Sequence, residues 1–121
     1  MPSKVINSYK DLQVWQKAIT LANDIYAVAE NFPSREVYGL SNQLRRAAVS
    51  IASNIAEGSV RGRKEFKHFI AISRGSLAEV ETQLIIAKNR GFVTADSFDS
   101  LIKQCDELSR MLFSLERSLS T

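Results

Sequence analysis

The sequence has few of the residues from which metal sites and disulfide frameworks are built. It contains one cysteine, Cys105, and one histidine, His68, among 121 residues. A single cysteine cannot close an intramolecular disulfide, and this pair supplies too few ligands for a four-ligand zinc site. Disulfide and metal scaffolds are therefore excluded, and no motif in the sequence calls for a cofactor.

Long apolar segments are also missing. The longest uninterrupted apolar run has five residues, Ile25–Ala29, whereas a helix that crosses a bilayer needs about 20. The first ten residues, Met1–Lys10, lack the apolar stretch of a cleaved secretory signal. We therefore expect a cytoplasmic protein with no membrane contact.

Glycine and proline are scarce, at five and two residues, and they fall between four segments of helical periodicity. Within each segment apolar residues recur at spacings of three and four, as on the buried face of a helix. The expected helices cover about residues 11–31, 35–57, 63–90 and 95–119, and no segment alternates like a strand. Short connections place consecutive helices antiparallel, so residues 1–121 are predicted to form one all-α, up-down-up-down four-helix bundle.

The residues at the segment ends predict where these helices begin and end. Ser34 is expected to cap the start of the second helix, and Thr94 the start of the fourth. Gly58 is placed where the second helix should end in a left-handed turn, and Gly91 is expected to end the third helix.

Positive charge is concentrated in the middle of the chain. The whole sequence has 16 basic and 13 acidic residues, but residues 35–74 hold eight basic and three acidic ones, a net charge of +5. Within residues 61–74 there are five basic residues and one acidic residue. Such a cluster is either a solvated loop or an anion-binding surface.

A second polar cluster is expected halfway along the bundle. Antiparallel pairing about the turn at residues 59–62 places Arg45 level with Ser76. Four polar side chains then fall within about one turn of that level: Asn42, Arg46, Arg74 and Glu79. A salt-bridge network that fixes the helix register is the favoured interpretation, and a ligand pocket is the alternative.

Catalytic groups are few. His68 is expected at the surface beside the basic turn, and Cys105 at a core position of the fourth helix. The segment Gly58–Gly62 lacks the strand and the Lys-Ser/Thr ending of a phosphate-binding loop. No catalytic residue is assigned. No group of exposed aromatic residues stands out as a platform for stacking bases, and Tyr9 and Tyr38 are expected to staple helix starts.

Four stretches of the sequence resemble one protein family. They are YKDLQVWQKA at 9–18, YGLSNQLRRAAVSI at 38–51, NIAEG at 54–58 and RGSLAEVETQL at 74–84. Together they are similar to the 23S rRNA intervening-sequence protein family over nearly the whole chain. One departure is Ala52, where family members often carry proline.

The resemblance implies a small bacterial four-helix bundle that assembles into a ring-like homopentamer. It also implies similarity to the accessory protein of diversity-generating retroelements, a basic pentameric bundle that binds nucleic acid and a reverse transcriptase.

The sequence therefore favours a non-enzymatic, oligomeric bundle that binds structured RNA or another nucleic acid through a basic surface. The principal phosphate contacts are predicted to be Arg61, Arg63, Lys64 and Lys67, with Arg45 and Arg46 in support. The alternative is a protein-interaction scaffold with no nucleic-acid role. A small enzyme would need a pocket among Asn42, Arg46, Arg74 and Glu79.

Overall fold

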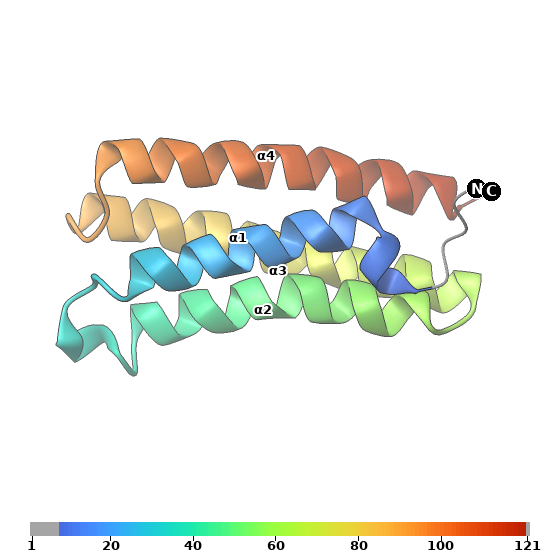
Figure 1. The fold of residues 1–121 in the computed structure, drawn as a ribbon, viewed down its shortest axis with the longest axis horizontal. Helices are drawn as coiled ribbons and strands as arrows, with labels where there is room; N and C mark the ends of the chain where they lie inside the picture. Colours follow the sequence, from blue (N-terminus) through green and yellow to red (C-terminus); the bar gives the residue numbers. More distant parts are fainter. Residues whose placement is uncertain (1–7, 121) are drawn as a thin grey trace, which may run out of the picture.

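A computed structural model describes residues 8–120 and contains four long helices in this part of the chain. They are α1 (Gln13–Ala29), α2 (Leu40–Ser59), α3 (Arg63–Asn89) and α4 (Ala95–Ser118), with short 3-10 turns η1 (Tyr9–Asp11) and η2 (Ser34–Glu36) before the first two. The helices run side by side and antiparallel, and no strand occurs among the described residues (Figure 1). The predicted all-α four-helix bundle is confirmed.

The core follows from the apolar spacing of the helices. In α4 the buried residues Leu101, Cys105, Leu108 and Leu112 are spaced by four, three and four, so they form one stripe facing the other helices. The other helices add fully buried Leu, Ile and Val side chains to the same cluster. Each such side chain contributes about 1.5–3 kcal/mol through removal from water. None of the described helices is both long enough and apolar enough to span a membrane.

Helices α2 and α3 pack closely through small side chains, along what we call the α2–α3 seam. The hydroxyls of Ser50 and Ser76 lie 2.9 Å apart, and the Ser73 hydroxyl donates to the Ile51 carbonyl at 2.9 Å. Near the turn, a Cβ added at Gly58 would lie 2.6 Å from the Cβ of Phe69. The chains can approach this closely only because these positions carry hydroxyls or no side chain.

Gly58 was expected to end α2 in a left-handed turn, and that prediction is wrong. The helix continues to Ser59, and Gly58 is buried within it. Its small size is used for packing rather than for backbone freedom. Gly91, with φ of 77°, is the only described residue with positive φ, and it follows the end of α3 as predicted.

The residues that touch across the α2–α3 seam are not those expected at equal height. Ser76 was expected level with Arg45, but it contacts Ser50, five residues further along α2. The physical reason is that side chains lean toward the N-terminus of their own helix. Residues that touch across an antiparallel pair therefore lie further along both chains than residues at equal height.

The start of α2 is a further correction. Residues 34–36 form η2, and the helix itself begins at Leu40 rather than near residue 35. Ser34 makes no cap for it; the Glu36 carboxylate accepts from the Leu40 amide at 3.0 Å instead. At α4 the expected cap is present, because the Thr94 hydroxyl accepts from the Ser97 amide at 3.1 Å.

Candidate nucleic-acid interface

The predicted phosphate contacts around the α2–α3 turn lie at one end of the bundle, where α4 also ends (Figure 1). Arg61 is not free there. Its guanidinium pairs with the Glu57 carboxylate at 2.6 Å and lies 5.1 Å from the Phe69 ring centre. Its charge is largely compensated by Glu57, so Arg61 is the weakest of the four predicted phosphate contacts.

The other three cations form a surface with His68, which we call the turn-end basic surface. One face of α3 carries Lys64, Lys67 and His68, because residues three and four positions apart are neighbours on a helix surface. They line a hollow of about 470 Å³, together with Glu65, Ala71 and Glu116. Arg63 donates to the Ser118 carbonyl, which ties the start of α3 to the end of α4. Among residues 8–120, none of the three cations forms an ion pair.

Arg45 and Arg46 do not join this surface. They lie 15 or more residues before Arg61 along α2, which is about 22 Å of helix. Their side chains also diverge: the Arg45 guanidinium lies 5.7 Å from the Tyr26 ring centre on α1. Arg46 lines a hollow on the α2–α3 side. The six predicted contacts therefore separate into a turn group and a mid-bundle group.

The predicted polar cluster is assembled only in part. Asn42, Arg46 and Glu79 line one hollow of about 400 Å³, in which the Gln83 Oε1 atom is buried without a hydrogen-bond partner. Arg74 lies elsewhere, because its side chain contacts α4 instead of joining the others. Its guanidinium pairs with Glu116 on α4 at 2.7 Å.

Phe113 belongs to a basic and aromatic cluster that the sequence analysis missed. Its ring is 48% exposed and lies close to two guanidiniums, those of Arg74 at 5.2 Å and Arg117 at 5.8 Å from the ring centre. The spacing of four between Phe113 and Arg117 is a signal that could have shown half of this cluster. The Arg74 half comes from another helix and has no local signal.

The remaining candidate chemical groups are inert or isolated. Cys105 is fully buried, and burial, with smaller effects of Glu81 and Asp106, raises the pKa of its thiol to about 12. The thiol is therefore not a nucleophile near neutral pH. The His68 ring packs edge-on against Phe69, with 5.8 Å between the ring centres. Within residues 8–120 no group of three His, Cys, Asp or Glu side chains could hold a metal ion.

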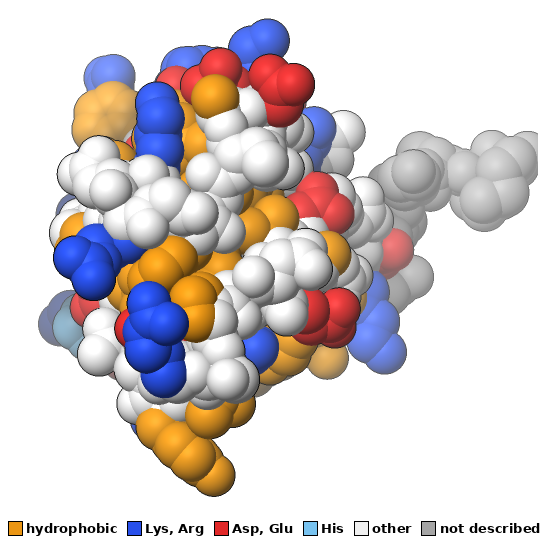
Figure 2. All heavy atoms as spheres, turned by 90° about the vertical axis from the view of Figure 1, so that its left-hand side faces the viewer, with side chains coloured by type: hydrophobic (Ala, Val, Ile, Leu, Met, Phe, Trp, Pro, Cys, Tyr) orange, Lys and Arg blue, Asp and Glu red, His pale blue; other side chains and the backbone are white. Residues whose placement is uncertain are grey.

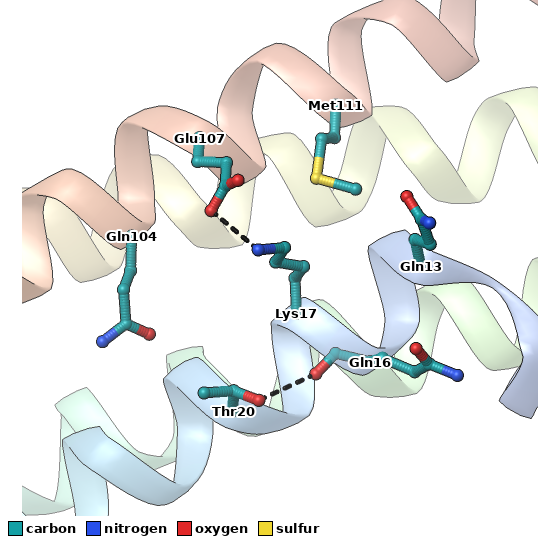
Figure 3. A pocket seen from close by; sticks show the side chains of 7 residues that line it. All are labelled: Gln13, Gln16, Lys17, Thr20, Gln104, Glu107 and Met111. Carbon is teal, nitrogen blue, oxygen red and sulfur yellow. Dashed lines mark hydrogen bonds and ion pairs between the residues drawn. The ribbon is translucent and has the colours of Figure 1, made fainter.

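A hollow lies between α1 and α4, away from the turn-end basic surface. It measures about 730 Å³ and is lined mainly by long polar side chains (Figure 3). An ion pair between Lys17 and Glu107, 3.0 Å long, bridges it. The Thr20 hydroxyl is turned back to the Gln16 carbonyl. The hollow holds an open, solvated ion pair, with no nucleophile beside a base.

Comparison with known proteins agrees with the fold. A solved protein of unknown function from the S23 ribosomal protein family of Bacteroides thetaiotaomicron has a TM-score of 0.76 and 23% sequence identity. The match covers 85% of this chain and 97% of that one. No curated protein matches the chain. The model of the 23S rRNA-intervening sequence protein family matches residues 10–114, and the chain therefore belongs to that family.

Proposed function

We propose that the protein is a non-enzymatic bundle that binds structured RNA, or another nucleic acid, through the turn-end basic surface. The observation that carries the proposal is that Lys64 and Lys67 line one hollow at this end of the described fold. Arg63 lies next to Lys64 in the sequence, and none of the three cations forms an ion pair among residues 8–120. Unpaired cations gathered on one surface attract phosphates and release counterions when they bind them. Arg61, Arg45 and Arg46 have secondary roles in this proposal.

At this surface the protein would recognise the sugar-phosphate backbone and the shape of the nucleic acid. The hollow beside Lys64 and Lys67 contains no exposed aromatic ring other than His68. Phosphate contacts from lysine and arginine position a nucleic acid but carry no sequence information. We therefore expect binding that depends on structure and charge more than on sequence.

The proposal includes assembly into a homo-oligomer, a pentamer if the family resemblance extends to assembly. Support comes from aliphatic side chains left in water on α3, where Ile72, Ile85 and Ile86 are 39%, 48% and 45% exposed. A ring would repeat the basic surface around one axis, so several weak phosphate contacts could act on one nucleic acid. Mass measurement by light scattering tests the subunit number.

A protein-interaction scaffold is the second candidate, with a protein partner such as a reverse transcriptase and no role for nucleic acid. The same exposed isoleucines favour it, because apolar surface of this kind is also used by protein partners. Salt separates the two candidates. Phosphate binding weakens steeply with salt, with a log–log slope near −0.7 to −0.9 for each phosphate neutralised.

The test is a titration of the protein against a structured RNA and a DNA duplex of equal length at several salt concentrations. The key variant combines Arg63→Glu, Lys64→Glu and Lys67→Glu. We expect its Kd to rise at least about tenfold at low salt, and its salt slope to flatten by about 3.

The control variant reverses the charge of three lysines outside the turn-end basic surface and has the same net charge as the key variant. Its substitutions are Lys10→Glu, Lys88→Glu and Lys103→Glu. We expect this control to keep the salt slope of the wild type. Equal weakening by both variants would mean that net charge alone attracts the RNA. Absence of wild-type binding at low salt would refute the proposal and favour the scaffold.

A further inference from the structure

The connection between α1 and α2 holds two apolar side chains in water. Tyr38 is 93% exposed, the highest value among the large hydrophobic residues of the described chain, and Val37 is 49% exposed. Tyr38 therefore does not staple the start of α2, as its position in the sequence predicted. A tyrosine placed this far from the core adds nothing to the packing of the bundle.

This exposed position is built by hydrogen bonds. The backbone amides of Glu36, Val37 and Gly39 each donate to the carbonyl three residues earlier, at 2.9–3.2 Å. The Glu36 carboxylate accepts from the Leu40 amide, and its carbonyl accepts from the Ser41 hydroxyl at 2.8 Å. Because the connection is already ordered, little conformational entropy remains to be lost when Tyr38 binds a partner.

Unpaired cations lie at the same end of the bundle. The Arg35 guanidinium is 5.9 Å from the Phe92 ring centre, and Phe92 packs on Phe32, so the α1–α2 and α3–α4 connections touch. Arg90 stands at the end of α3 beside them. Neither arginine forms an ion pair among residues 8–120. The nearby Glu36 carboxylate is turned toward the backbone of α2.

The view onto this end shows how the side chains are distributed (Figure 2). Hydrophobic side chains occupy its centre and project from its lower edge. Lysine and arginine side chains gather mainly on one side, and acidic ones on the other and at the top. The end is therefore an apolar surface with a basic flank, which we call the loop-end surface.

We propose that the loop-end surface binds an unpaired nucleotide, whose base stacks on Tyr38 while Arg35 and Arg90 hold the adjoining phosphates. An exposed flat ring and unpaired guanidiniums at the same end of the bundle are complementary to a flat base joined to a phosphate. The inference rests on the proposed function, since it adds a second contact for the same nucleic acid. It assigns that contact to single-stranded nucleotides, whereas the turn-end basic surface takes phosphates of structured regions.

The separation of the two surfaces fixes the size of the ligand that can reach both. They lie at opposite ends of α2, whose 20 residues span about 30 Å. A duplex of about 10–12 base pairs has this length, given a rise near 3 Å per pair. A duplex of that size with an unpaired end can therefore touch both surfaces at once, and a blunt one cannot offer Tyr38 a free base.

The experiment compares a blunt 12-base-pair RNA duplex with the same duplex carrying three unpaired nucleotides at one end. The variants are Tyr38→Ala, Tyr38→Phe and the triple reversal at Arg63, Lys64 and Lys67. We expect Tyr38→Ala to raise the Kd for the overhang duplex about tenfold and to leave the Kd for the blunt duplex unchanged. Tyr38→Phe keeps the ring and should bind as the wild type does.

A crosslink locates the contact independently of affinity. A 4-thiouridine in the unpaired segment, irradiated in the complex, should attach to the peptide that contains Tyr38 by mass spectrometry. Because Tyr38 is exposed, its replacement should not unfold the bundle, and circular dichroism checks this.

The outcomes separate the two proposals. If the wild type binds neither duplex, the proposed function fails. If it binds both equally, or if Tyr38→Ala weakens both or neither, the proposed function stands and the loop-end inference is overturned.

Discussion

The α2–α3 seam and the seams made by α4 are built from different kinds of side chain. Serine hydroxyls, alanines and Gly58 bring α2 and α3 together, with Ser73 and Ser76 buried. The polar contacts of α4 with the other helices include two ion pairs of long side chains, Lys17–Glu107, with both side chains 48% exposed, and Arg74–Glu116. They also include a hydrogen bond from the Gln104 amide to the Asp24 carboxylate. Two helices whose backbones approach closely fit together in only one register. Solvated ion pairs, by contrast, contribute only about 0–1 kcal/mol each to stability. The α2–α3 seam therefore specifies the bundle, and the α4 seams close it.

The sharpest way to break the α2–α3 seam is Gly58→Ala. The added Cβ would lie 2.6 Å from the Phe69 Cβ, a contact that only a shift of α3 can relieve. We expect a loss of about 1–3 kcal/mol of unfolding free energy, measured by urea denaturation. Gly75→Ala is the matched control on the exposed side of α3, where an added Cβ meets nothing within 4 Å. It should stabilise the protein by up to about 1 kcal/mol. Equal effects at the two glycines would contradict the contrast.

A pH test examines the α3–α4 seam. Burial, and to a smaller extent the nearby Asp106, raises the pKa of Glu81 above its ordinary value of 4.5. The folded protein therefore binds this proton more tightly than the unfolded chain, and stability is lost as pH rises through the raised pKa.

Glu81→Gln removes this loss of stability at high pH, because glutamine does not ionise. We expect the Tm of the variant to exceed that of the wild type by about 1–2 °C at pH 7 and the difference to vanish near pH 4. Glu79→Gln on the same helix controls for the removal of one negative charge. A variant that is less stable than the wild type at pH 7 would show that the Glu81 carboxylate is needed in its charged form.

The smallest effect is expected at the α1–α4 ion pair. A double-mutant cycle with Lys17→Met and Glu107→Gln should give a coupling energy below about 0.5 kcal/mol, which falls further at high salt. Urea denaturation at two salt concentrations measures it. A coupling above about 1 kcal/mol would mean that α4 is held by specific charges after all.

Much of the fold could be predicted from the sequence, because apolar spacing reports which face of a helix is buried. The positions of α1, α3 and α4 were expected within about two residues of their observed ends. The start of α2 could not be predicted, since residues 34–36 form a short 3-10 turn and the helix begins only at Leu40. The Glu36 carboxylate accepts a hydrogen bond from the Leu40 amide there. The register of the α2–α3 seam depends on how side chains lean, which residue counting ignores.

The candidate site was predicted less well, for a physical reason. Sequence locates a positive charge, but the partner that neutralises it lies on another helix or turn. Arg74 finds Glu116 across 42 residues, and the start of α3 is tied to the Ser118 carbonyl across 55. Tyr38 looks like a packing residue in the sequence, and only the hydrogen-bonded turn before Leu40 leaves it in water.

The short turn between α2 and α3 also has a consequence for how the chain folds. Only residues 60–62 separate these helices, so their contacts close small loops and lose little chain entropy. The contacts of α4 with α1 join residues about 80–90 apart, such as Asp24 with Gln104. We expect the α2–α3 hairpin to form first and α4 to dock last. In the native protein we expect local unfolding to occur in the reverse order. Transient opening would begin with the separation of α4 from α1, and it would expose core side chains before the α2–α3 hairpin unfolds.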